Sequence, residues 1–170
     1  MKNLSFFVLA LGSLIGFSGE VQGQELQVIL EKNIKYSHDE ENWYPSLSVA
    51  LDGLTADQSN WKDNSGNHSI SQLVSHLVFW NGRMLKTMKG EDVAQFDGNN
   101  DNTFTNFTQE EFNTLTRQLD TILSSIEEVS RSFTKEEIEN WAPTLANIAS
   151  HNAYHTGQIV YIRKQKGWWR

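Results

Sequence analysis

Two histidines near the C-terminal end of the chain, His151 and His155, lie four residues apart in the stretch "SHNAYHTGQIVYIRKQKG". In an α-helix, residues i and i+4 share a face about one turn apart, so both imidazoles can reach a single ion. Asn147 and Gln158 lie close by on the same helix and are candidates to hold the rings or to line a pocket. A polar surface stripe, or two hydrogen-bonded core histidines, would give the same spacing.

A third histidine, His76, lies at the border of the apolar stripe of another predicted helix. A helical bundle places helices side by side, so His76 can face the His151 and His155 pair across the core. Three neutral imidazoles with open coordination positions are typical of a catalytic metal site, whereas a partly buried histidine without a ligand role is the plain alternative. His38 and His68 fall in polar, loop-like stretches and are expected to be exposed, or else at the rim of the pocket.

The elements that must position these histidines are predicted to be helices. Ser69 to Gln72 and Thr108 to Glu111 are capping-box signatures, and each precedes a helical stripe in which eight of nine positions are apolar. The loop between them, residues 91–107, is rich in Asp, Asn and Gly and is long enough for a crossover connection. No strand pattern and no internal repeat is visible. The predicted fold is therefore all-α, a four-helix bundle.

The remaining helices are less sharply bounded. From Gln24, a first helix is expected to bury Leu26, Ile29, Leu30 and Ile34 on one face. Pro45 suits the first turn of a new helix, because its missing N–H costs nothing there. The sequence "TKEE" from Thr134 is interpreted as a short turn, and the last helix is expected to run from about Pro143 to Gly167.

Size and charge limit the function classes. At 170 residues, with 38% hydrophobic and 21% charged residues, the chain is a single globular domain. The net charge of -7 argues against a nucleic-acid partner, and the cations in the last turn (Arg163, Lys164 and Lys166) complement the helix dipole. The chain has no cysteine, so disulfides are excluded and a metal site must use histidine, carboxylate or water. A homodimer stays possible.

The N-terminus resembles an export signal. Lys2 precedes an apolar run from Leu4 to Phe17, and small residues at Val21 and Gly23 suit a cleavage site before Gln24. The run is short for a membrane span, and no cysteine follows it for a lipid anchor. The predicted organisation is a signal peptide at 1–23 and a mature domain at 24–170, exported to the periplasm or secreted. A retained anchor is the alternative.

The stretch "GNHSISQLVSHLVFWNGRMLKTMKG", together with "SHNAYHTGQIVYIRKQKG", resembles the DinB/YfiT-like superfamily of bundle metalloproteins. The resemblance covers nearly all of residues 24–170. It implies a four-helix bundle and a divalent ion, such as nickel or zinc, held by His76, His151 and His155. Tyr154 stands where many relatives carry a further histidine and is not counted as a ligand.

The resemblance implies several activities, because the family includes thiol-dependent transferases and isomerases and proteins described as metal-dependent hydrolases. An exported chain argues against a cytosolic thiol co-substrate. The predicted function is thus an exported metal-dependent hydrolase or transferase acting on an unidentified small molecule, with a non-catalytic metal- or ligand-binding bundle as the alternative. A plain interaction protein without a metal is a further possibility. Because the imidazoles must be neutral, metal affinity is expected to fall below about pH 6.5.

No general base is evident beside the histidines. Asp39, Glu40 and Glu41 lie between the first two helical segments and are expected to face solvent, although they could reach the mouth of the site. Beside them, Trp43 and Tyr44 are expected to form the pocket wall.

Overall fold

The computed structural model describes residues 14–169, with side chains from residue 23 onward. The described part is helical and contains no strand, as predicted. Its elements are, in order, α1 (Leu14–His38), α2 (Leu47–Leu51), α3 (Ala56–Asn60), α4 (Ile70–Met88), a 3-10 turn η1 (Asn100–Thr103), α5 (Gln109–Arg131) and α6 (Lys135–Gln165).

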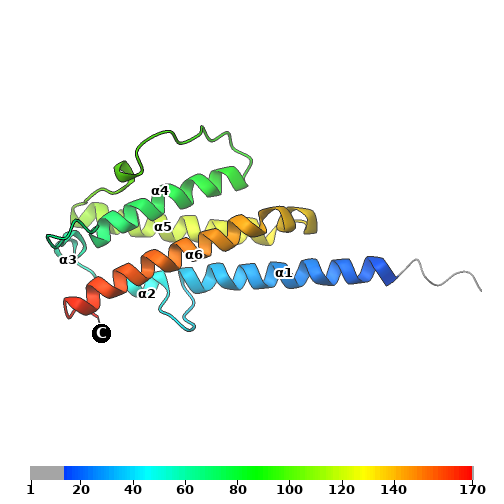
Figure 1. Ribbon diagram of the computed structural model, residues 1–170, viewed down its shortest axis with the longest axis horizontal. Helices are drawn as coiled ribbons and strands as arrows, with labels where there is room; N and C mark the ends of the chain where they lie inside the picture. The colour runs from blue at the N-terminus through cyan, green and yellow to red at the C-terminus, as the bar shows by residue number, and fades with distance from the viewer. Residues whose placement is uncertain (1–13, 170) are drawn as a thin grey trace, which may run out of the picture.

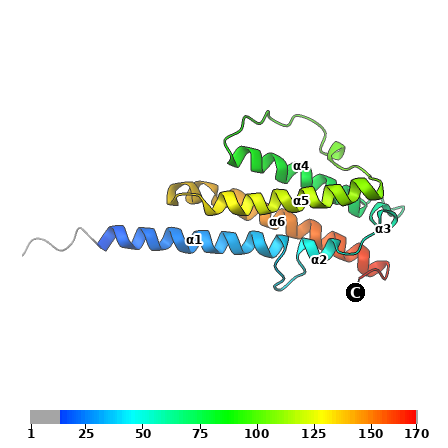
Figure 2. The same ribbon diagram turned by 180° about the vertical axis from the view of Figure 1, so that it is seen from behind.

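The four long helices form a bundle in two parallel pairs. Helix α1 packs chiefly on α6, and α4 packs chiefly on α5. Figures 1 and 2 show that α4 and α5 run in one direction, and that α1 and α6 run in the other. Two consecutive helices can be parallel only if the chain returns along the full length of the first, so the predicted crossover connection is confirmed.

The crossover between α4 and α5 lies along α4 in the reverse direction (Figure 1). Arg83 donates to the carbonyl of Ala94 near the end of α4, and Trp80 Nε1 donates to Asn100 Oδ1 (3.1 Å) one turn earlier. Near the start of α4, Ser71 Oγ donates to Asn106 Oδ1 at 3.3 Å. The loop is therefore fixed to α4 by polar side chains at each stage of its return.

The starts of α4 and α5 are those that the sequence predicts. Ser69 and Thr108 are N-caps, and each forms a complete capping box with the residue three positions on. The apolar stripes that follow lie in one core with the buried residues of α1 and α6. Its largest fully buried side chains are Phe112, Ile34, Leu47, Ile70, Leu73, Leu77, Leu119, Leu123, Ile126, Ile138, Leu145 and Ile159.

The predicted start of the last helix is wrong. Thr134 is the N-cap of α6 and forms a capping box with Glu137, so the helix begins two turns before Pro143. Pro143 lies inside the helix and on its exposed side. Proline removes the hydrogen bond to the carbonyl of Glu139, which is also at an exposed residue and can bind water instead. The capping box and the buried Ile138 outweigh this local cost.

Other local predictions also need correction. Helix α1 buries Leu30 and Ile34 as expected, but Ile29 is exposed. The polar residues 58–68 suggest a turn, but residues 58–60 belong to the short helix α3, which is capped by Thr55 and Gln58.

At the other end, residues 1–13 of the predicted signal peptide lie outside the described residues. Helix α1 continues across the predicted cleavage position between Gly23 and Gln24. Within the part that the structure describes, no helix is both long enough and apolar enough to span a bilayer.

Candidate metal centre

The structure brings together the three histidines that the sequence singled out. Helix α4 supplies His76, and α6 supplies His151 and His155 from successive turns. The Nε2 atoms of His76 and His151 are 3.1 Å apart, and those of His151 and His155 are 3.0 Å apart. One ring nitrogen from each residue lies within 4.8 Å of the others, which is the arrangement of a group that could hold a metal ion.

These separations fit ligands of one ion. Two nitrogens bound at about 2.1 Å are about 3.0 Å apart when the angle at the ion is a right angle, and about 3.4 Å apart at a tetrahedral angle. The observed Nε2–Nε2 distances of 3.1 and 3.0 Å match the right angle. Hydrogen bonding alone explains the geometry poorly, because the single Nε2 of His151 would have to serve two partners.

The outer nitrogens of two rings are fixed by neutral partners. With the Gln158 amide oriented so that Oε1 faces His155, this oxygen accepts from His155 Nδ1 at 2.6 Å. Thr103 Oγ1 lies 2.7 Å from His76 Nδ1 and donates its own hydrogen to the carbonyl of Asn100 at 2.7 Å, so it must accept from His76. Both imidazoles thus carry a hydrogen on Nδ1, and the lone pair on Nε2 is directed at the centre of the group.

Burial keeps the three imidazoles uncharged. The pKa of His76 falls to about 4, chiefly through desolvation and then through repulsion from His155, His151 and His68. The pKa of His151 also falls to about 4 by desolvation and by repulsion from His155. Desolvation lowers the pKa of His155 as well, against the opposing hydrogen bond to Gln158. Neutral imidazole is the form that binds a metal ion.

A family model for the DinB superfamily matches residues 40–159, which include all three histidines. The chain belongs to the DinB superfamily. No curated protein and no solved structure matches it. The all-α bundle and the crossover between α4 and α5 are in keeping with this membership.

The triad of this DinB-superfamily protein borders a cavity of about 450 Å³. His76 and His151 line it, together with Trp80, the amides of Asn81, Asn100 and Asn147, and Met84, Thr144 and Ile148. Among these described lining residues, none is an acidic side chain, Lys or Arg. Asn147 therefore belongs to the pocket, whereas Gln158 is the partner of a ring, so both roles suggested by the sequence occur.

The predicted pocket wall is wrong. Trp43 is 97% exposed and Tyr44 is also exposed, and both lie outside the cavity beside the triad. They belong to the loop between α1 and α2, whereas the wall of the cavity comes from α4, α6 and the crossover loop.

The crossover loop contributes two residues, Thr103 and Phe104, that the sequence does not predict at the site. Thr103 holds His76, as described, and the Phe104 ring lies parallel to His76 at 4.2 Å between centroids. The ring of His68 lies parallel to Phe104 at 3.7 Å. Phe104 is therefore stacked between the two imidazoles. Nothing in the spacing of the loop residues indicates this role, because it depends on where the loop crosses α4.

The expectation that His68 and His38 are exposed is wrong. His68 is half-buried by its stacking on Phe104, and its Nδ1 is buried with no hydrogen-bonding partner. His38 is the last residue of α1 and only 3% exposed. Its burial follows from polar contacts with α5, which the local sequence around it does not encode.

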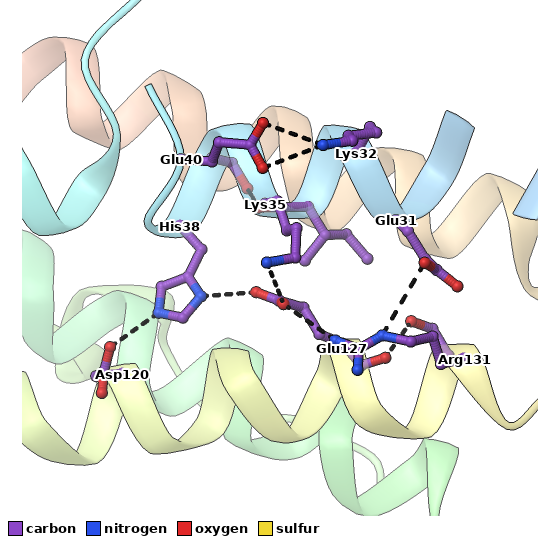
Figure 3. Close-up of polar contacts among 11 residues, drawn as sticks. Glu31, Lys32, Lys35, His38, Glu40, Asp120, Glu127 and Arg131 are labelled. Carbon is purple, nitrogen blue, oxygen red and sulfur yellow. Dashed lines mark hydrogen bonds and ion pairs between the residues drawn. The ribbon is translucent and has the colours of Figure 1, made fainter. Parts of the chain in front are cut away.

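The polar cluster around His38 joins α1 to α5 (Figure 3). His38 Nδ1 lies 2.7 Å from Glu127 Oε1, and His38 Nε2 lies 3.0 Å from Asp120 Oδ1. The other oxygen of Glu127 is 3.6 Å from Lys35 and 3.5 Å from Arg131. His38, Asp39 and Glu127 also have ligand-type atoms within 4.8 Å of one another. Both oxygens of Glu127 are engaged by cations or by His38, so this cluster is better described as an interhelical ion-pair network.

Proposed function

We propose that this protein is an exported, metal-dependent hydrolase or transferase that acts on a small molecule. A divalent transition ion would be held by Nε2 of His76, His151 and His155. The observation that supports this most strongly is the convergence of the three Nε2 atoms, with separations of 3.1 and 3.0 Å. Imidazole donors suit zinc and nickel among the common divalent ions.

The ion and the residues around the triad would have different roles. Bound to neutral ligands, such an ion keeps its double charge, lowers the pKa of a bound water and polarises a carbonyl group. Thr103 and Gln158 fix the orientation of two ligand rings through their Nδ1 hydrogens. Asn100 and Asn147 line the adjoining cavity and can hold a polar substrate by hydrogen bonds, whereas the buried Asn81 already donates its amide hydrogens to Leu77 and Asn152. Trp80 and Met84 supply an apolar wall.

One observation favours a second candidate, a non-catalytic metal- or ligand-binding bundle. General acid–base catalysis needs a group that titrates beside the substrate. Apart from His76 and His151, the described residues that line the cavity contain no titratable side chain. A hydrolase of this kind would depend on the ion and its bound water for most of its rate enhancement. A binding protein would need nothing more than is present.

Export is proposed on the sequence alone. It is supported by Lys2, by the apolar run up to Phe17, and by Val21 and Gly23 as the small residues of a cleavage site before Gln24. N-terminal sequencing of the protein from the periplasm or the medium tests it. A chain starting at or near Gln24 is expected, and soluble cytoplasmic protein that keeps Met1 would contradict the proposal.

The metal content of the full chain, expressed without an affinity tag, tests whether the protein binds the ion on which the proposed function depends. Elemental analysis is expected to find close to one divalent transition ion per chain, and His151→Ala should abolish it. The metal-loaded protein is then assayed for hydrolysis of neutral esters and amides, with the chelated protein as control. If the protein failed to bind nickel or zinc even after reconstitution, both a metal-dependent enzyme and a metal-binding protein would be ruled out.

A further inference from the structure

We propose that a second cavity, which adjoins the metal centre through Gln158, binds a small neutral molecule with an aromatic ring and a hydrogen-bond acceptor. The cavity has a volume of about 560 Å³ and lies between α6 and residues 61–68. None of the three candidate ligand histidines lines it. Its volume falls within the range of about 300–1,000 Å³ that is common for small-molecule sites.

Three aromatic side chains form its walls. Tyr154 and Tyr161 lie two turns apart on one face of α6, and Trp61 comes from the loop after α3. The two tyrosines are 64% and 67% exposed, so large ring surfaces are left uncovered by the protein itself. Aromatic rings gain most by stacking face to edge or offset on another ring. The walls therefore favour a ligand that carries a flat aromatic group.

The polar side of the cavity offers a hydrogen-bond donor. Gln158 lines it, and its Oε1 already accepts from His155. Its Nε2 has only a long contact of 3.5 Å with the hydroxyl of Tyr154. The amide hydrogens of Gln158 are thus available to a carbonyl or hydroxyl oxygen of a ligand.

The charges lining the cavity balance. Lys62 and Asp63 are neighbours in the chain and both line it, and no other Lys, Arg, Asp or Glu does so among the described residues. An anionic or a cationic ligand would find one partner and one like charge. A neutral ligand meets neither penalty, so the cavity favours uncharged molecules.

N-acetyl-L-tyrosinamide is a suitable probe, because it combines a phenol ring with two amide carbonyls and has no charge. N-acetyl-L-alaninamide is the matched control without the ring. Each is titrated into the metal-free, isotope-labelled full chain and followed by amide chemical shifts. For the tyrosine compound we expect a dissociation constant on the order of 1 mM, with shifts confined to residues 61–68 and to 154–165 of α6. The alanine compound should cause no saturable shifts.

Tyr161→Ala tests the wall directly, and its exposed side chain can be removed without disturbing the core. We expect the affinity for N-acetyl-L-tyrosinamide to fall about 5-fold, in line with the loss of one aromatic contact. Tyr44→Ala, an exposed tyrosine outside this cavity, should leave it unchanged.

Three results would each overturn the proposal. The tyrosine compound could cause no saturable shifts, it could shift residues of the cavity beside His76 and His151, or Tyr161→Ala could bind it as tightly as the wild type. Because the protein is metal-free, none of these results bears on the metal centre.

Discussion

The histidine triad and the polar cluster around His38 lie in the same bundle, and their imidazoles have different partners. In the triad of His76, His151 and His155, the outer nitrogens of His76 and His155 are held by a threonine and a glutamine, and the Nε2 atoms face one another. At His38, by contrast, both ring nitrogens face carboxylate oxygens (Figure 3). Each ring nitrogen of His38 is thus covered by a carboxylate, and neither is directed at open space or at another imidazole.

The difference shows that the partners of a buried histidine decide its role, more than its burial does. Neutral acceptors on Nδ1 leave a basic Nε2 available, and a shared centre lets several rings contribute to one ion. At His38, acidic partners contact both ring nitrogens, and these contacts are part of the polar network that joins α1 to α5. This difference between the triad and the His38 cluster can be tested by mutation and by pH.

The largest effect is expected at the triad. His76→Ala, His151→Ala and His155→Ala should each weaken binding of nickel or zinc at least about 100-fold, because two imidazoles compete poorly with water for an ion. His38→Ala and His68→Ala should bind as the wild type does. Calorimetric titration of the chelated proteins measures all five. If His38→Ala lost metal binding, the ion would bind at the His38 cluster and not at the triad.

The triad should also make the metal-free protein sensitive to acid. Unfolded histidines bind protons near pH 6.5, whereas the pKa of His76 and of His151 in the fold is about 4. Between these values the unfolded chain binds more protons, so stability rises with pH across this window and is level above it.

Urea unfolding of the chelated protein from pH 4 to 8 measures this slope. The chelated protein should stay helical at pH 7, because the core is apolar. The double variant His76→Gln, His151→Gln should show a shallower slope, and an equal slope would contradict the assignment. The same pKa values shift the expected loss of metal to lower pH than the 6.5 of an ordinary histidine.

At the ion-pair network, the expected effect is on stability alone. His38→Ala leaves the buried Glu127 without its closest partner, and the free energy of unfolding should fall by about 1–3 kcal/mol. Metal affinity should not change. Glu40→Ala is a control, since Glu40 pairs with Lys32 in the same region and not with the His38 cluster among the described contacts. A fall in metal affinity without a fall in stability would reverse the roles of the two groups.

The smallest effect is expected from the outer partner of His76. Thr103→Val preserves shape but removes the acceptor for Nδ1, and metal affinity should fall about 10-fold. Thr103→Ser should restore it. Thr105 lies in the same loop, and its hydroxyl bonds to Ser75 of α4; Thr105→Val is therefore the matched control and should bind metal normally. If Thr105→Val were as weak as Thr103→Val, the loop and not the hydrogen bond would be responsible.

Local patterns were enough to predict much of the fold. Ser69 and Thr108 cap their helices through neighbours three residues away, and the stripes behind them depend only on helical periodicity. The triad was predictable for the same reason, since His151 and His155 are one turn apart and His76 lies beside an apolar stripe. Burial of His38 and the role of Thr103 depend on contacts across 89 and 27 residues of chain. No local pattern encodes such pairings. At the start of α6, the capping box of Thr134 and Glu137 begins the helix two turns before Pro143, where the sequence was expected to begin it.

X-ray absorption spectroscopy of the nickel-loaded, untagged full chain tests the central claim most directly, because it counts the ligands of the ion. The account predicts three imidazole nitrogens at about 2.0–2.1 Å, with oxygen ligands from water completing the shell. His76→Ala should show two imidazoles at reduced occupancy. A spectrum with one imidazole and carboxylate oxygens would contradict the account, since it would place the ion at His38 and Glu127.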